Sequence, residues 1–399
     1  MSSTHPQLDQ VALGYSPMID PKRMVMATRL TVFPIRPDVA VAASPLLAAV
    51  TEVWGADAGL VSLAVHSEAL LQELMAARPG ANLMLEVPAF MACNPAHSQA
   101  LLALKANGNT LLIKGRPLSD LSPEVLACFK YSIIDLDDDR YLGDTTAAPG
   151  AMRSIQLVQS GVYTLADMAA SFQRGAVAVM GWPMDDSPTT QSAKPEARAD
   201  LQVIMELIKR VDQEDSIDKL EATLRRDPSL AFKLMRYLNS AAFGFTMEIS
   251  SFRHAIMLLG YVRLKRWLAL LLSTASKDAN MRPLMFAAVR RGLLMEELAG
   301  PGGEAEVRDE MFICGMFSLL DRMLHQPFDH LLKNVPVPER VSQALVHNAG
   351  PYQPYLELVH AIETESLFDF RAAAEQLMLE PKEINHAVLR ALDKARQLD

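Results

Sequence analysis

The sequence contains few cysteines, and their spacing excludes a disulfide framework. Three occur among 399 residues, Cys93, Cys128 and Cys314, and no two form a Cys-x-x-Cys pair. An odd and sparse count is typical of a reducing compartment. We interpret all three as small buried hydrophobic residues and expect the protein to be cytoplasmic.

Targeting segments and long hydrophobic runs are lacking as well. The first ten residues, MSSTHPQLDQ, have no charged start followed by an apolar core, so they do not predict a signal peptide. The longest apolar stretch, residues 39–50, contains Pro45 and falls short of the roughly 20 residues that span a bilayer. We therefore expect no association with a membrane.

An excess of positive charge is also absent. The 38 Lys and Arg residues are outnumbered by 47 Asp and Glu residues, which gives a net charge of -9. This balance excludes a globally basic nucleic-acid binder but leaves a local patch open. Residues 253–266 carry four basic side chains around Gly260. Two helices joined by a glycine turn with basic flanks are also a pattern of the DNA-binding helix-turn-helix. We interpret them as a solvated helix face and expect no nucleic-acid partner.

The composition that remains predicts two domains. Half of the residues are hydrophobic, which is enough for two cores in a chain of this length. Residues 185–195 (DDSPTTQSAKP) lose all apolar periodicity, which is typical of a linker. We place the first domain at residues 1–190 and the second at residues 191–399.

The first domain has the pattern of an α/β fold. Short apolar runs at residues 111–113 and 132–136 alternate with helical stretches at residues 67–77 and 98–107. Buried strands that alternate with helices indicate parallel pairing. The spacing suits either a barrel or a doubly wound sheet, and the pattern alone does not choose between them.

The second domain is predicted to be all-helical. Residues 200–211 carry apolar side chains at helical spacing. Asp227 and Pro228 predict the start of another helix, because Asp caps well and Pro suits the first helical position. That helix should run to about Asn239.

Residues 225–270 resemble the HDOD domain. The resemblance rests on ordered pieces of sequence: Asp227-Pro228, Leu238-Asn239-Ser240, Phe243-Gly244, Ile249-Ser250-Ser251 and Ala255 through Gly260. It implies a helical fold related to the metal-dependent HD phosphohydrolases but without their ligands.

The residues themselves argue against an HD metal site. No His-Asp dipeptide occurs anywhere in the chain. Leu320 stands where the ligand histidine is expected, which leaves Asp321 alone, and Arg290 stands where another histidine is expected. Leucine offers no lone pair and arginine repels a cation. We therefore expect no metal in this domain.

The first domain resembles a degenerate EAL domain, a (β/α)-barrel that hydrolyses cyclic di-GMP with two metal ions held by carboxylates. Leu85-Glu86-Val87-Pro88 is similar to the family's L-E-I-P run. The matched motif positions are Arg29 for the signature Glu, Val65 for Asn, Glu86 retained, Lys114-Gly115 for the paired Asp, Asp135 retained, Ser160 and Tyr163 for two acids, and Met180 for Gln.

These replacements predict that the barrel holds no metal ion or other cofactor. Two divalent cations need several anionic oxygens to offset their repulsion. Arg29 and Lys114 would instead add positive charge, each at a cost on the order of several kcal/mol. Glu86 and Asp135 alone should not outweigh that cost.

The predicted function is therefore a non-catalytic scaffold or regulator that acts through protein–protein contacts in a signalling circuit. Neither the partner nor the oligomeric state follows from the sequence, and a homo-oligomer stays open. The alternative is an effector that binds cyclic di-GMP without cleaving it, with Arg29, Lys114 or Arg116 contacting phosphates. An active phosphodiesterase is the third hypothesis.

Overall fold

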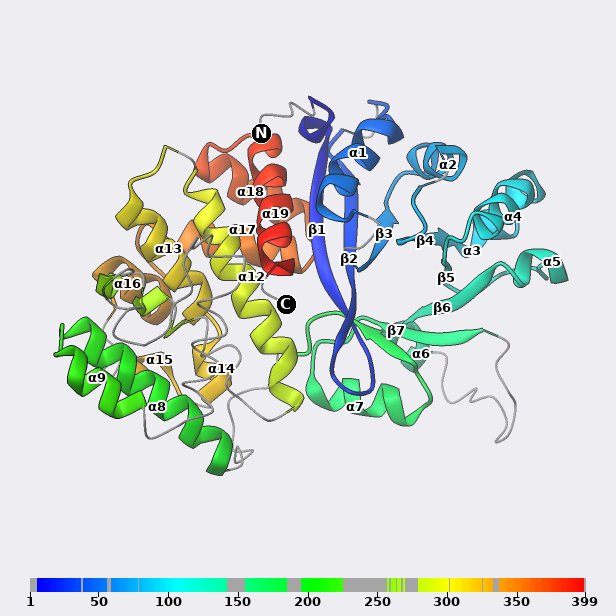
Figure 1. The fold of residues 1–399 in the computed structure, drawn as a ribbon. Coiled ribbons are helices and arrows are strands. Elements are labelled where there is room, and N and C mark those ends of the chain that lie inside the picture. The colour runs from blue at the N-terminus through cyan, green and yellow to red at the C-terminus, as the bar shows by residue number, and fades with distance from the viewer. Residues whose placement is uncertain are drawn as a thin grey trace. The chain divides into compact units, whose positions relative to one another are not determined.

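A computed structural model gives the fold of the chain (Figure 1). It describes residues 6–36, 39–55, 59–77, 79–141, 155–184, 195–224, part of 257–269, 279–300, 302–324, 326–332 and 337–397. Of the predicted linker at 185–195, residues 185–194 lie outside these residues and Pro195 is the first residue of helix α8 (Pro195–Asp212). The predicted helix at 227–239 lies outside them as well. The chain divides into two compact units, which are described separately.

The first unit is built on a closed barrel of eight strands, which decides between the barrel and the doubly wound sheet. Strands β2 to β8 pair in parallel, each with the next in the chain. The strands are β1 (Val11–Ile19), β2 (Val25–Pro34), β3 (Leu60–Val65), β4 (Leu83–Pro88), β5 (Leu111–Lys114), β6 (Phe129–Asp135), β7 (Gln156–Ser160) and β8 (Ala178–Met180).

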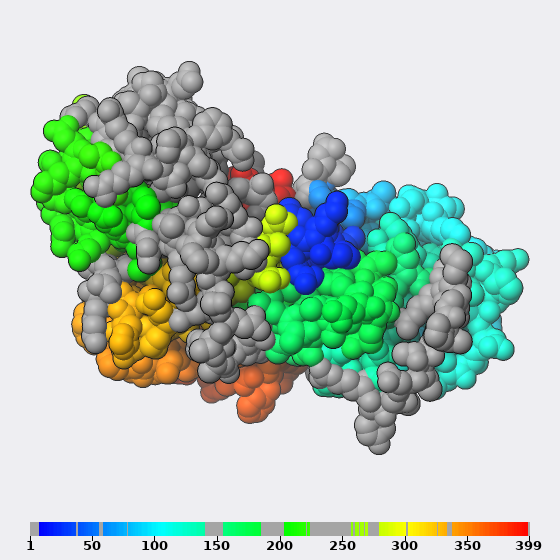
Figure 2. All heavy atoms as spheres, turned by 90° about the horizontal axis from the view of Figure 1, so that it is seen from below, coloured from blue at the N-terminus to red at the C-terminus, as the bar shows by residue number. Residues whose placement is uncertain are grey.

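Strand β1 departs from the predicted parallel pattern. It runs antiparallel to both of its neighbours, β2 and β8, and forms a hairpin with β2. Arg23 adopts a left-handed φ of 65° in the turn, and its guanidinium lies 4.9 Å from the Phe172 ring centre. Figure 2 shows this turn, in blue, beside the green surface of α7. A short turn of this kind can join only antiparallel strands.

Helices follow most of the parallel strands and cover the barrel (Figure 1). Several begin with a side-chain cap; Ser122 and Thr164, for example, accept hydrogen bonds from the backbone of the first helical turn. The helices are α1 (Ala43–Val53), α2 (Glu68–Ala77), α3 (Ala89–Ala92), α4 (Ser98–Ala106), α5 (Pro123–Leu126), α6 (Leu136–Tyr141) and α7 (Leu165–Gln173).

The first unit also contains residues 360–389, which the sequence assigns to the second domain. These residues include the end of α17 (Gln353–Glu363), all of α18 (Leu367–Leu377) and the first half of α19 (Pro381–Arg396). The predicted division at residues 190 and 191 misses this return of the chain. The second unit, residues 186–359 and 390–399, is therefore inserted in sequence between two parts of the barrel unit.

Asn385 shows why this C-terminal segment belongs to the barrel. Its fully buried amide accepts a hydrogen bond from the Leu13 N–H at 3.0 Å and donates to the carbonyls of Leu8 (2.7 Å) and Val11 (2.6 Å). The indole N–H of Trp182 donates to the carbonyl of Glu363 at 3.1 Å. Backbone groups of β1 that would otherwise be buried without partners are satisfied by this segment.

Gly14 in β1 permits the close approach of the same segment. A Cβ atom at this position would lie 2.9 Å from the carbonyl oxygen of Ile362 and 3.2 Å from Cγ of Glu365. We expect Gly14→Ala to lower the free energy of unfolding of the barrel by about 1–3 kcal/mol, because a backbone oxygen must move. Urea unfolding measures this change. Gly55→Ala, whose added Cβ meets nothing within 4 Å, is the matched control and should change stability by less than about 0.5 kcal/mol.

The second unit is helical throughout the part that the structure describes, in agreement with the predicted fold class. The helix predicted at residues 200–211 is confirmed within α8. The described helices that lie in this unit are α8 (Pro195–Asp212), α9 (Ile217–Leu224), α12 (Arg282–Leu298), α13 (Ala305–Phe317), α14 (Leu320–Leu324), α15 (Phe328–Leu331) and α16 (Glu339–His347). None of the helices in the described residues is long and apolar enough to cross a bilayer.

Helix α13 packs closely on α12, since a Cβ atom at Gly315 would collide with the backbone of Arg291, and its neighbour Cys314 is buried. This cysteine is fully buried, and burial raises the pKa of its thiol to about 12. At a pH of about 8 only about one thiol in ten thousand is then ionised, and thiolate is the reactive form. We expect iodoacetamide to leave Cys314 unlabelled at that pH and to label it in urea, while the partly exposed Cys93 reacts in the native protein. Mass spectrometry of the labelled peptides checks this; equal native labelling of both residues would contradict the buried position.

Candidate functional site

The candidate site lies inside the barrel, where polar side chains of adjacent strands meet. Arg29 of β2 is in register with Ser62 of β3, and Glu86 follows on β4. All three are buried. In barrels of this type, the chemistry is carried by residues at the carboxyl ends of the strands.

Arg29 and Glu86 form a two-point ion pair. The Arg29 Nε lies 2.6 Å from Oε1 of Glu86, and Nη2 lies 3.0 Å from Oε2. The Ser62 hydroxyl donates to Oε1 of the same carboxylate at 3.2 Å. This fork-on-fork geometry is the strong form of an arginine–carboxylate contact. The side chains are 9% and 1% exposed, so water screens the pair little.

Glu365 from the C-terminal segment completes the cluster. Both of its carboxylate oxygens accept hydrogen bonds from Nη1 of Arg29 at 2.7 Å, and the Ser16 hydroxyl donates to Oε1 at 3.2 Å. Glu365 has a left-handed φ of 57° and lies between α17 and α18. It is separated from Arg29 by 336 positions in the chain, and no local pattern in the sequence marks it.

The electrostatics of the cluster keep Arg29 and Glu86 ionised near neutral pH. Burial alone would raise the pKa of Glu86, but the charge and hydrogen bonds of Arg29 outweigh it, so the pKa of Glu86 is lowered. Burial opposes the charge of Arg29, and the two carboxylates overcome it and raise the pKa of the guanidinium. Arg29 is thus a fixed internal cation between two carboxylates.

This donor set does not fit a pair of divalent metal ions. The oxygens of Glu86 and Glu365 that could ligate a metal accept hydrogen bonds from Arg29 instead. Within the described part of the chain, no group of three or more His, Cys, Asp or Glu side chains could hold a metal ion. A cation placed next to the Arg29 guanidinium would meet a like charge at close range.

The remaining motif positions of the barrel fall into two groups: polar side chains near the cluster, and side chains without a functional group. Asp135, at the end of β6, accepts hydrogen bonds from the Ser160 hydroxyl at 3.1 Å and from the Asp137 N–H at 3.0 Å. Tyr163 is 47% exposed, and partial burial followed by the charges of Glu365 and Asp135 raises its pKa.

The other positions are structural. Val65 ends β3, and Gly115 has a left-handed φ of 85° directly after β5. Met180 is 1% exposed and packs in the hydrophobic core inside the barrel. These three side chains carry no group that could ligate a metal ion or transfer a proton.

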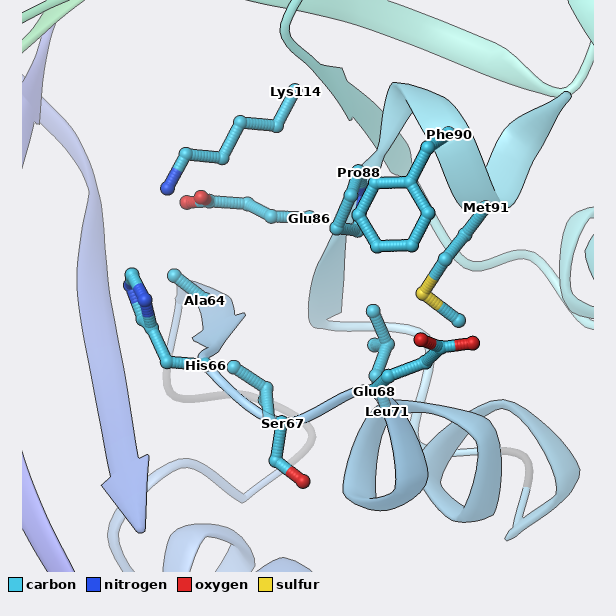
Figure 3. Close-up of a pocket in the computed structure, with 11 residues that line it drawn as sticks. Ala64, His66, Ser67, Glu68, Leu71, Glu86, Pro88, Phe90, Met91 and Lys114 are labelled. Carbon is cyan, nitrogen blue, oxygen red and sulfur yellow. The ribbon is translucent and has the colours of Figure 1, made fainter. Parts of the chain in front are cut away.

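A cavity of about 460 Å³ opens beside this cluster (Figure 3). Lys114 points into it, and in the described residues its ammonium has no hydrogen bond or ion pair. Burial, followed by the charges of Lys114 and Arg29, lowers the pKa of His66, so this imidazole is neutral at physiological pH. Arg116 faces Asp139 in a partly exposed ion pair of 2.8 Å. Arg29, Lys114 and Arg116 were the three predicted phosphate contacts. Among the described residues, Arg29 and Arg116 are paired with carboxylates, and Lys114 is unpaired.

The positions of the HD motif in the second unit are filled without a metal-binding set. Arg290 is 3% exposed and its guanidinium lies 3.2 Å from the centre of the Phe286 ring. Leu320 is buried. Asp321 has its pKa raised chiefly by burial, and its Oδ1 has no hydrogen-bond partner among the described atoms. The two carboxylate oxygens of this one residue are not a metal site.

Comparison with known proteins confirms the predicted relationship. Residues 199–324 match the HDOD domain. The chain is 31% identical over 166 residues to the uncharacterized protein YuxH of Bacillus subtilis, and the match covers 40% of each protein. It is 27% identical over 162 residues to the cyclic di-GMP phosphodiesterase CdgJ of Vibrio cholerae, covering 40% of this chain and 38% of CdgJ. The chain thus spans about 40% of the length of these relatives.

The barrel resembles solved EAL structures. One is the PaMucR phosphodiesterase in complex with c-di-GMP, with a TM-score of 0.34 and 17% identity. That match covers 44% of this chain and 91% of the phosphodiesterase chain. The molecule thus combines a closed eight-stranded barrel with a helical HDOD domain.

Proposed function

We propose that this chain is a non-catalytic component of a cyclic di-GMP signalling circuit and acts through protein–protein contacts in the cytoplasm. Its relationship to CdgJ supports the circuit. The HDOD domain supports a role in interaction. The sparse cysteines are consistent with a reducing compartment.

The observation that carries the proposal is the position of Arg29. A guanidinium that bridges two carboxylates supplies the positive charge that metal ions would supply in a hydrolytic site. It is held by the protein, so it brings no bound water that could be ionised to a nucleophile. The barrel keeps the closed eight-stranded fold, and its described residues offer no set of ligands for the metal ions that would activate water.

A hydrolysis assay tests the proposal directly. The full chain is incubated with cyclic di-GMP and an excess of Mg²⁺ or Mn²⁺, and the linear product is measured by chromatography. We expect no product above the protein-free control. Metal-dependent turnover that disappears in Glu86→Gln would show that the barrel is an active phosphodiesterase and would refute the proposal.

A second candidate is an effector that holds cyclic di-GMP without cleaving it. The unpaired Lys114 in an open cavity favours this hypothesis, since an ammonium can contact a phosphate. Calorimetric titration separates it from the scaffold. We expect no heat of binding at high micromolar ligand, whereas saturable heat that Lys114→Gln abolishes would establish the effector.

A further inference from the structure

We propose that the cavity beside Glu86 is a docking site for an acidic segment of a partner protein, which places one apolar side chain against Phe90 and Met91 and one carboxylate next to Lys114. The inference rests on the proposed scaffold function and names the surface that would perform it. All of the cavity lies within the barrel unit, at the ends of β3, β4 and β5.

The apolar part of the cavity comes from α3 and its surroundings. Figure 3 shows Phe90 and Met91 on one side and the Lys114 and Glu86 head groups on the other. Pro88 and Leu71 line the space between. Phe90 is 62% exposed. Covering its ring with another molecule would remove apolar surface from water and would therefore favour binding.

A second exposed apolar side chain lies in the loop after β5, which contacts the end of α3. The thiol of Cys93, at the end of α3, contacts the carbonyl of Ser119 at 3.6 Å, which brings the loop after β5 next to α3. Leu118 in that loop is 100% exposed. An exposed aromatic residue that lines a cavity, with a further exposed apolar residue in a neighbouring loop, is typical of a protein interaction site, where a few apolar anchors supply most of the binding energy.

The charges of the cavity favour a single carboxylate over a nucleotide. Lys114 is the unpaired cation among the described lining residues, His66 is neutral, and the carboxylates of Glu68 and Glu86 line the same space. One ammonium matches one side-chain carboxylate of a partner. A ligand with two phosphates would bring two negative charges to a space with one unpaired ammonium, so one of its charges would stay unmatched.

The size of the cavity also fits a peptide. Its volume of about 460 Å³ lies in the range of cavities that hold a ligand of several groups, and it exceeds the space that one side chain fills. A segment with an apolar anchor and a neighbouring Asp or Glu would fill both the apolar and the charged part. An aromatic or aliphatic anchor meets Phe90 and Met91, and the carboxylate meets Lys114.

Selection from a phage-displayed library of random peptides tests the proposal on the full chain. We expect the enriched peptides to share an apolar residue flanked by Asp or Glu. Selection on Lys114→Glu should replace the acidic flank by Lys or Arg, because the variant reverses the charge that the flank meets. The chosen peptides should bind about tenfold more weakly to Phe90→Ala.

Matched variants at the other end of the barrel are the controls. Lys130→Glu makes the same charge reversal at an exposed position near the start of β6, and Leu60→Ala removes an apolar side chain that is 39% exposed at the start of β3. Both should bind the peptides as the natural chain does. The proposal is overturned if no peptide is enriched, if the flank does not change with Lys114→Glu, or if cyclic di-GMP competes for the site. The first two results leave the absence of hydrolysis untouched, so the two proposals fail separately.

Discussion

Replacing Arg29 by methionine should lower the free energy of unfolding of the barrel by about 3–5 kcal/mol, because it leaves two carboxylates without their cation. Methionine keeps the length of the aliphatic stem, so packing changes little. Glu86 is 1% exposed and Glu365 is 19% exposed at the side chain, and neither can recover the lost contact from water without moving. Urea unfolding in a Trp267→Phe background, followed by the fluorescence of the two remaining tryptophans, both in the barrel unit, measures the change.

The stability lost in Arg29→Met should depend on pH in a definite direction. In the natural chain the pKa of Glu86 is lowered from its usual 4.5, so the stability that ionised Glu86 contributes is present above about pH 5 and is lost as the pH falls. Without Arg29, burial raises the pKa of the same carboxyl. The difference in stability between the natural chain and Arg29→Met should therefore shrink as the pH is lowered toward 4.

Two control variants show whether the effect belongs to the cluster. Arg116→Met breaks an exposed ion pair with Asp139 and should cost no more than about 1 kcal/mol. The triple change of Arg29→Met, Glu86→Gln and Glu365→Gln removes all three charges and should recover much of the stability that the single change loses. A loss for Arg29→Met no larger than that for Arg116→Met would show that the cluster contributes little.

A large part of the fold could be predicted from the sequence because the relevant signals are local. The apolar runs at residues 111–113 and 132–136 identify β5 and β6, and the helical spacing of residues 200–211 identifies α8. Parallel pairing follows from strands that alternate with helices. The antiparallel β1 was not predicted because all nine of its residues are buried, so the alternation that marks a half-exposed strand is missing.

The candidate site could be predicted only in part, for a different physical reason. The sequence indicates that Arg29 and Lys114 add positive charge where metal ions would bind, and that Glu86 and Asp135 are the acids retained there. It does not indicate Glu365, whose carboxylate balances Arg29 from the other end of the chain. A charge balance drawn from one domain therefore overestimated the positive potential of the barrel. Arg29 and Glu365 are 336 positions apart, and their contact depends on the tertiary fold, which no local sequence pattern indicates.

The second prediction with a large effect follows from residues 360–389, which belong to the barrel unit. It concerns residues 1–185 expressed without them. We expect this fragment to be insoluble or to lack a cooperative unfolding transition. It would lose the three hydrogen bonds of Asn385 to the backbone around β1 and would leave Arg29 with one carboxylate instead of two. The packing of the C-terminal segment on Gly14 would also be missing. Together these losses are of the same order as the usual net stability of a domain, about 5–15 kcal/mol.

A fusion of the two parts of the barrel unit distinguishes this explanation from general fragility of a fragment. The indole of Trp182 donates to the carbonyl of Glu363. The ends to be joined, residues 185 and 360, are each three positions along the chain from this contact, so a short linker is enough. A Gly/Ser linker of about eight residues has the reach to join them. Residues 1–185 linked to residues 360–389 should fold with one cooperative transition, and the same fusion with Asn385→Ala should be less stable by about 1–3 kcal/mol. If residues 1–185 fold equally well alone, the C-terminal segment is an accessory to the barrel and not part of it.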